Sequence, residues 1–226
     1  MEPTSRRRAL AALAGSAALI PAVARAEAKP ADDDDIPPTE DLMREHGVIR
    51  RTLGVYEELA KRLESPTPPD VHVVQSAAEL IRHFAEGYHE KLEEEQVFPR
   101  LEKANILVKL CGTLRAQHAA GRAVTAQILA AATSAGWSDP KVRASIIPGM
   151  RGFVAMYQPH AAREDTEVFI ALRKLVGPKK LDELGDQFEE QEHKLLGQNG
   201  FEKALAEVEA LEKSLGIDDL ARFTVK

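Results

Sequence analysis

Two pairs of side chains in this sequence have the types and the spacing of metal ligands. His89 is followed four residues later by Glu93, and His160 is followed four residues later by Glu164. Residues four apart on a helix lie about 40° from each other, so each pair projects from one stripe of its helix. Imidazole nitrogens and carboxylate oxygens are ligands that suit divalent transition metals. The spacing therefore predicts two helices that each supply two ligands.

Two further histidines, His46 and His118, fall at the same level if four helices run antiparallel. Eighteen residues separate His46 from the expected end of its helix, and eighteen separate position 71 from His89. Both legs span about 27 Å, and similar counts bring His118 and His160 to that level. Four imidazoles and two carboxylates meeting in the core would hold two divalent cations, with the carboxylates bridging them. Without metal, burying the two glutamates would be costly.

The elements that must position these residues are helices. Apolar residues recur at helical spacing through most of the chain, for example at Leu42, Val48, Ile49 and Leu53, and no segment alternates as a strand does. We expect an all-α protein: an up-down-up-down four-helix bundle followed by a C-terminal pair of helices. The segments expected to be helical are 39–64, 71–98, 106–132, 140–176, 178–196 and 201–215.

Capping residues and prolines set the expected helix ends. Thr39 and Asp70 are the predicted N-caps of the first two helices, and Asp139 is that of the fourth. Proline lacks an N–H and clashes with the preceding helical turn. We therefore expect Pro99 to end the second helix, and two prolines inside the fourth to kink or break it, Pro148 and Pro159.

At these residues the sequence resembles the hemerythrin-like (HHE cation-binding) family over roughly residues 40–176. The motif appears as HEKLEEEQVFPRL (89–101) and is echoed by HAAREDTEVF (160–169), with REHG (44–47) and QHAAGR (117–122) on the other two helices. The resemblance implies a bundle that holds a non-haem di-iron centre. In that centre two glutamates would be bridges, Glu93 and Glu164, and four histidines would be terminal ligands, namely His46, His89, His118 and His160.

The third helix departs from the pattern of oxygen-carrying hemerythrins, which place two histidines four residues apart there. The position one turn before His118 is Leu114. One terminal ligand is therefore missing, which argues against reversible oxygen carriage. We expect an open coordination position at this point, or a substitute ligand such as Glu90 or a water.

Two residues near His160 are candidates for supporting roles. Some relatives use an aspartate five residues after the histidine as the second bridge, and Asp165 stands there, although Glu164 faces the site better. Tyr157 precedes His160 by one turn and could donate a hydrogen bond near the metal, but an aromatic residue at helical spacing is equally explained as core.

A ferritin-like di-metal site is the alternative metal hypothesis. Glu86 with His89, and Glu190 with His193, both satisfy the Glu-x-x-His signature. This interpretation leaves three of the four aligned histidines without a role. His193 stands in the charged sequence EEQEHK, so we expect it to lie on a charged helix face. His83 lies about 240° round the helix from His89 and His72 about 25 Å along it, so we expect both to be solvated or at the boundary of the core.

These residues support three functional hypotheses. The first is a di-iron protein that binds or reacts with O2, NO or peroxide for sensing, storage or detoxification, although the same ligands would also take manganese or zinc. The second is catalysis, either NO or peroxide reduction with an external electron donor, or repair of iron centres. The third is a metal-free helical module that binds a partner.

The N-terminal sequence indicates where the protein is located, and the composition limits its partners. Residues 1–26 contain consecutive arginines, a short apolar run and Ala24-Arg25-Ala26, which predicts an export signal resembling the twin-arginine type and a periplasmic protein. Residues 27–38 form an acidic, proline-containing leader, 39–177 the bundle, and 178–226 the C-terminal helices and tail. The net charge of −6 argues against nucleic acid, and one cysteine, Cys111, excludes an intramolecular disulfide. No stretch qualifies as a membrane span.

Overall fold

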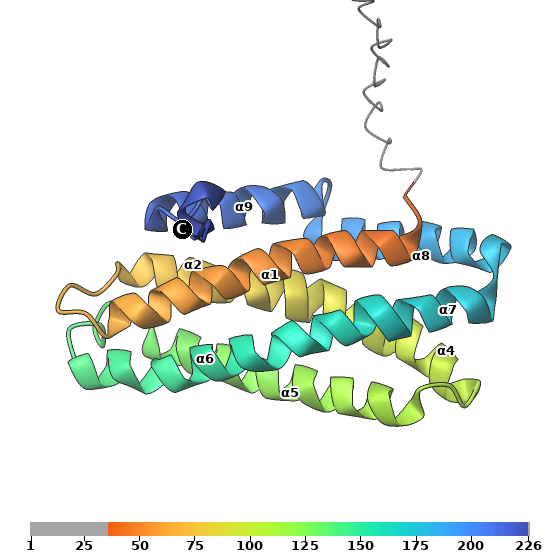
Figure 1. Ribbon diagram of the computed structural model, residues 1–226, viewed down its shortest axis with the longest axis horizontal. Helices are drawn as coiled ribbons and strands as arrows, with labels where there is room; N and C mark the ends of the chain where they lie inside the picture. The colour runs from red at the N-terminus through yellow and green to blue at the C-terminus, as the bar shows by residue number, and fades with distance from the viewer. Residues whose placement is uncertain (1–35, 226) are drawn as a thin grey trace, which may run out of the picture.

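Four helical segments run antiparallel and form the bundle that the sequence predicts (Figure 1). The computed structural model describes residues 36–225, and within that range it contains helices and no strand. The first and third segments are α1 (Pro38–Leu63) and α5 (Val108–Ala131). The other two segments alternate between α-helix and π-helix (η) along their length. The second segment consists of α2 (Val71–Leu80), η2 (Ile81–His89), α3 (Glu90–Leu92), η3 (Glu93–Val97) and α4 (Phe98–Lys103). The fourth consists of α6 (Pro140–Arg163), η4 (Glu164–Val168) and α7 (Phe169–Val176).

The predicted apolar stripes line the inside of the bundle. Leu42, Ile49, Leu53 and Tyr56 are almost completely buried. Burial of an aliphatic side chain of this size contributes roughly 1.5–3 kcal/mol, so the core strongly specifies which face of each helix turns inward. The predicted all-α bundle is confirmed.

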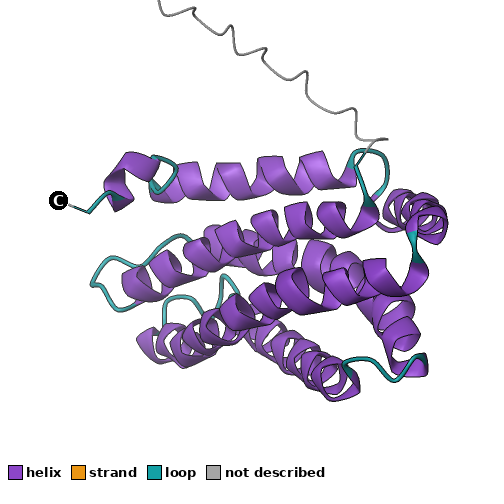
Figure 2. Cartoon of the chain, turned by 45° about the vertical axis from the view of Figure 1, so that its right-hand side comes forward, coloured by secondary structure: helices purple, strands orange, loops and turns teal. Residues whose placement is uncertain are grey.

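A pair of C-terminal helices covers one side of the bundle. These helices are α8 (Pro178–Leu196) and α9 (Gly200–Leu215), and both views show α9 alongside α1 and α2 (Figures 1 and 2). Phe188 and Val208 are buried in the common core. The guanidinium of Arg51 in α1 donates from Nε to Glu212 Oε1 in α9 at 2.9 Å. A short 3₁₀ turn, η5 (Leu220–Phe223), follows.

Two of the three predicted N-caps are present. The carboxylates of Asp70 and Asp139 each accept a hydrogen bond at 2.8 Å from the backbone N–H two residues further on. The prediction for Thr39 is wrong because the N-cap of α1 lies two residues earlier, at Pro37, and Pro38 is already in the first turn. The fixed φ angle of proline suits that first position.

The three prolines interrupt less than the sequence predicts. The helix containing Pro99 continues to Lys103. Because Pro99 has no N–H, the carbonyl of Glu94 lacks the bond that the π-helical register would give it. That carbonyl instead accepts from Arg115 Nη1 at 3.0 Å.

Pro148 and Pro159 lie inside α6, which is helical throughout, so the expected break is absent. Both prolines are exposed. The carbonyls that they leave unpaired belong to Ala144 and Ala155, which are also exposed, so water can satisfy them.

The predicted export signal, 1–26, and residues 27–35 of the predicted leader lie outside the described residues. Among the described residues, no helix is both long and apolar enough to cross a membrane.

Candidate metal centre

Six buried side chains from four helical segments meet at one level of the bundle. Each is at most 2% exposed. The sequence predicts this convergence from helix spacing, and the structure brings all six together. They are His46 from α1, His89 and Glu93 from the second segment, His118 from α5, and His160 and Glu164 from the fourth.

The six side chains divide into two groups of four that share both carboxylates. The ligand atoms of His46 and His89 lie within 4.8 Å of one another and of oxygens from Glu93 and Glu164. The same limit holds for His118 and His160 with these two glutamates. Each group offers two nitrogens and two carboxylate oxygens, which is a donor set for one divalent cation.

Each carboxylate presents one oxygen to each group. Glu164 Oε2 lies 3.3 Å from His46 Nε2, while its Oε1 lies 3.1 Å from His160 Nε2. Glu93 Oε1 lies 3.6 Å from His89 Nε2, while its Oε2 lies 3.5 Å from His118 Nε2. Both glutamates are therefore placed to bridge two ions.

The atoms at the centre lack hydrogen-bond partners of acceptable geometry. These orphaned buried atoms are both oxygens of Glu93, both oxygens of Glu164, and His89 Nε2. His118 Nε2 and His160 Nε2 face each other at 3.0 Å, close enough for both nitrogens to bind one cation. Orphaned buried polar atoms are costly, so the residues present fit a pair of cations.

Electrostatics at the centre reflects the crowding of buried ionisable groups. Burial raises the pKa of Glu93 well above its usual value, and the neighbouring Glu164 raises it further. Burial lowers the pKa of His118 to about 4 and that of His89 well below its usual value. Burial also opposes ionisation of Glu164, but the adjacent imidazoles of His160 and His46 outweigh burial and lower its pKa. Neutral imidazoles are the form that binds metal.

A ring of side chains around the six fixes the orientation of every histidine. The Nδ1 atoms of His46, His89 and His118 donate to carboxylates, at 2.6 Å to Asp165, 2.6 Å to Glu45 and 2.9 Å to Glu94. His160 Nδ1 donates to the amide oxygen of Gln117 at 2.8 Å. Because carboxylate or amide oxygens accept at every Nδ1, the proton is held there and each Nε2 turns inward with its lone pair free.

Each helical segment supplies the acceptor for the histidine of the next segment, and the fourth supplies it for the first. Each acceptor stands directly beside one of the six in the sequence, yet it serves the histidine of a neighbouring helix. Glu45 on α1 accepts from His89 in the second segment, and Glu94 in the second segment accepts from His118 on α5. Gln117 on α5 accepts from His160 on α6, and Asp165 in the fourth segment accepts from His46 on α1. We name these four residues the acceptor ring. The sequence analysis identified only Asp165 among them.

The two halves of the site are related by an approximate twofold repeat. Both bridging glutamates begin a five-residue π-helix, Glu93–Val97 and Glu164–Val168. Each π-helix is followed by a phenylalanine, and these rings stack on ligand histidines: Phe98 on His118 with centroids 5.8 Å apart, and Phe169 on His46 with centroids 5.5 Å apart. π-helical turns frequently occur at functional sites.

Comparison with known proteins agrees with this geometry. Residues 38–172, more than half of the chain, match the family described as hemerythrin HHE cation binding domain. The chain belongs to this hemerythrin family.

The similar mycobacterial proteins are named as uncharacterized, so they assign no function. The chain is 40% identical over 204 residues to uncharacterized protein Mb2018 of Mycobacterium bovis and, equally, to uncharacterized protein Rv1995 of Mycobacterium tuberculosis. The match covers 90% of this chain and 80% of each relative. No solved structure matches the chain significantly.

Three other residues predicted from the sequence lie around the centre of this hemerythrin domain, namely Asp165, Tyr157 and Glu90. Asp165 binds His46 from outside and also pairs with Arg50, while Glu164 occupies the position between the two groups. Tyr157 packs its ring against His160 with centroids 4.9 Å apart, but its hydroxyl has no hydrogen-bond partner. The hydrogen bond near the metal therefore stays a prediction.

Glu90 lies outside both groups of four. Its carboxylate faces Arg122 Nη2 at 2.8 Å, and the same guanidinium contacts Glu94 at 2.8 Å. Glu90 and Glu94 also lie near His118, but both carboxylates already contact Arg122. Leu114 is buried and apolar, so the position where oxygen-carrying hemerythrins have a further histidine offers no ligand.

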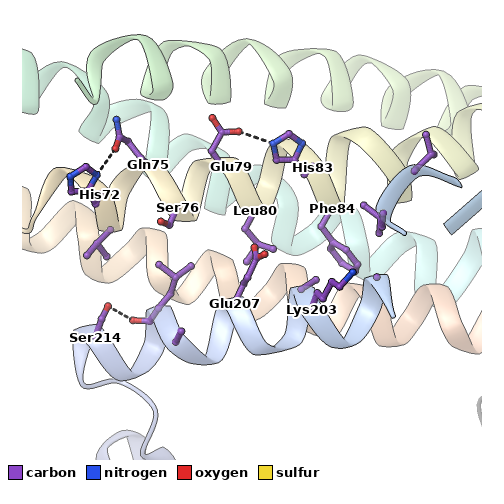
Figure 3. Close-up of a pocket in the computed structure, with 17 residues that line it drawn as sticks. His72, Gln75, Ser76, Glu79, Leu80, His83, Phe84, Lys203, Glu207 and Ser214 are labelled. Atoms are coloured by element: carbon purple, nitrogen blue, oxygen red, sulfur yellow. Dashed lines mark hydrogen bonds and ion pairs between the residues drawn. The ribbon is translucent and has the colours of Figure 1, made fainter. Parts of the chain in front are cut away.

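The ferritin-like alternative does not fit the described residues. Glu190 and His193 are exposed on α8. His72 and His83 are exposed as predicted, and both line a groove of about 770 Å³ between the second segment and α9 (Figure 3). There His83 Nε2 pairs with Glu79 at 3.1 Å. Neither histidine belongs to the metal centre.

Proposed function

We propose that this protein holds two non-haem iron ions and uses them to bind or react with a small molecule, namely O2, NO or peroxide. The family and the buried cluster together indicate a metal-binding protein. The observation that carries the more specific proposal is the division of the six side chains into two groups that share Glu93 and Glu164. A pair of iron ions held there would supply one-electron redox chemistry and open coordination positions.

The donor count favours reaction with a small ligand over simple structural binding. Each group provides two histidine nitrogens and two shared carboxylate oxygens, and Leu114 adds none. An iron ion with two histidines and carboxylates commonly retains positions for an external ligand. The surrounding residues exclude bulk water, because both the histidines and the stacked rings of Phe98 and Phe169 are buried.

Location in the cell envelope is part of the proposal. It is supported by the arginine-rich, apolar and small-residue pattern of positions 1–26. A twin-arginine signal exports proteins that are already folded, which suits a protein that receives its metal before export.

Metal analysis with absorption spectroscopy tests the proposal. We expect two iron ions per chain after anaerobic loading, and charge-transfer bands after exposure to air or azide. The variant His118→Ala should lose metal and bands. Its matched control is His83→Ala, which removes an exposed histidine on another face. Fewer than one iron per chain with no such bands would contradict the proposal.

Catalytic reduction is the second candidate, favoured by the missing ligand at Leu114. Such turnover needs an external electron donor, because the sequence shows no flavin, haem or nicotinamide motif. Multiple turnovers of NO or peroxide with a supplied reductant, lost in His118→Ala and retained in His83→Ala, would identify an enzyme. A single stoichiometric reaction would identify a binding protein or a sensor.

A further inference from the structure

The approximate twofold repeat of the metal centre is broken at one charged position. His46 corresponds to His118, and His89 corresponds to His160. Glu45 stands just before His46 and Gln117 just before His118, so these two residues occupy matching positions in the acceptor ring. Glu45 is a carboxylate, whereas Gln117 is a neutral amide.

The other two members of the acceptor ring match in charge and surroundings. Asp165 accepts from His46 and pairs with Arg50. Glu94 accepts from His118 and pairs with Arg122. Each half therefore contains one histidine held by an arginine-paired carboxylate, so this part of the ring does not distinguish the halves by the charge of the acceptor, although the contact to His46 is the shorter.

The remaining two contacts differ in strength. Glu45 is 2% exposed, and its two oxygens accept from Tyr88 Oη at 2.9 Å and from His89 Nδ1 at 2.6 Å. Gln117 is only half-buried and accepts from His160 Nδ1 at 2.8 Å. A carboxylate acceptor pulls more strongly on the Nδ1 proton than an amide does, so it makes Nε2 a better electron donor to metal.

Glu90 does not compensate for this difference. Its carboxylate is buried on the His118 side, but it faces Arg122 and makes no hydrogen bond to a histidine. Among the described residues, the hydrogen bonds to the Nδ1 atoms of the four ligand histidines all involve the acceptor ring.

We infer that the two halves of the centre bind their ions with unequal affinity: the His46–His89 half fills first, and Gln117 makes the His118–His160 half the weaker one. This inference rests on the proposed two-metal centre. Loss of a single outer hydrogen-bond partner typically costs 10–100-fold in metal affinity, so replacing a carboxylate by an amide should separate the two halves by about tenfold, or about 1.4 kcal/mol.

Titration of the metal-free full-length protein with Co²⁺ gives the first measurement. We expect two steps of one ion each, with the first at least about tenfold tighter. Repulsion between two ions would also split the titration, even in a symmetric site. The location of the first ion therefore decides the question, and anomalous diffraction from crystals holding one equivalent of Co²⁺ reports it. We expect the ion beside His46 and His89.

Exchange of the two ring residues supplies the matched variants. Gln117→Glu should tighten the second step about tenfold and leave the first within about threefold, whereas Glu45→Gln should weaken the first step about tenfold. The double variant Glu45→Gln with Gln117→Glu should move the first ion to His118 and His160. A purely structural role for these residues predicts no such reversal.

Each outcome has a definite meaning. A first ion beside His46 and His89, which relocates in the double variant, supports the inference. Equal occupancy of both halves at one equivalent, or a first ion that stays in place in the double variant, overturns it but leaves the two-metal centre intact. Failure to bind Co²⁺ at the six side chains overturns the two-metal centre and the inference with it.

Discussion

At the scale of single residues, the metal centre consists of a shell of ligands inside a shell of acceptors. The inner residues were predictable because helix spacing places them at one level. The acceptors were harder to predict, because each is directed at a different helix. Their sequence signal is nevertheless simple: each stands next to a ligand, about 100° round the helix, as in Glu45-His46 and Gln117-His118. Such a neighbour faces the adjacent helix of a bundle.

Removing the bridging charges should separate metal binding from folding. In the metal-free protein, Glu93→Gln with Glu164→Gln should change the free energy of unfolding only slightly, because burial already disfavours the charge on Glu93, and the attraction that Glu164 loses to His46 and His160 is offset by removal of a buried charge. The variant should also lose the stabilisation that metal gives the wild type, about 2.7 kcal/mol per site at a metal concentration 100 times Kd. Denaturant unfolding with and without metal measures both effects. Equal stabilisation of variant and wild type by metal would contradict the assignment.

The acceptor ring should matter for affinity rather than for folding. Asp165→Asn should weaken metal binding by about 10–100-fold, because His46 loses its carboxylate acceptor. Glu167→Gln is the matched control, since Glu167 lies two residues further on and pairs with Arg163 outside the centre. Competition with a metal chelator gives both affinities. Equal affinities in the two variants would show that Asp165 has no role at the site.

At the scale of elements, the sequence predicted the helices well and their internal irregularities poorly. The four bundle segments and the C-terminal pair follow from apolar periodicity and from caps such as Asp70. The π-helices did not follow, because a bond from residue i to i+5 has no reliable side-chain signature. Pro148 and Pro159 misled the prediction because they lie on an exposed face, where the freed carbonyls reach water.

The C-terminal helices should behave as part of the bundle core. Leu211 on α9 is 6% exposed and belongs to the same apolar cluster as the bundle. Leu211→Ala should lower the free energy of unfolding by about 2–3 kcal/mol and leave the metal stoichiometry unchanged, because the ligands lie on other helices. Leu195→Ala on α8 is the control, since Leu195 is 39% exposed. Its effect should be within about 0.5 kcal/mol. Loss of metal in Leu211→Ala would show that α9 also shapes the centre.

At the scale of the whole molecule, the export pattern of residues 1–26 supports the proposed cell-envelope location, and the net charge bears on the partners. Removal of residues 1–26 would take four arginines and one glutamate from a chain whose net charge is −6, so the mature protein would be more acidic still. An acidic protein with a buried metal centre has little attraction for nucleic acid. This agrees with a small-molecule ligand as its partner.

Export should depend on the arginines themselves. Replacement of Arg6, Arg7 and Arg8 by lysine keeps the positive charge that an ordinary secretory signal needs, but it removes the twin-arginine pair. We expect the wild type in the periplasmic fraction, with a mass that corresponds to cleavage after Ala26, and the triple variant uncleaved in the cytoplasm. Normal export of the variant would indicate the ordinary secretory route. Retention and no cleavage of the wild type would contradict the location.

The most direct test of the whole account is the anomalous diffraction map of crystals fully loaded with iron. We predict two iron peaks in the bundle core, one beside His46 and His89 and the other beside His118 and His160, with the carboxylates of Glu93 and Glu164 touching both. The absence of iron between these histidines, or iron bound only at surface carboxylates, would contradict the account.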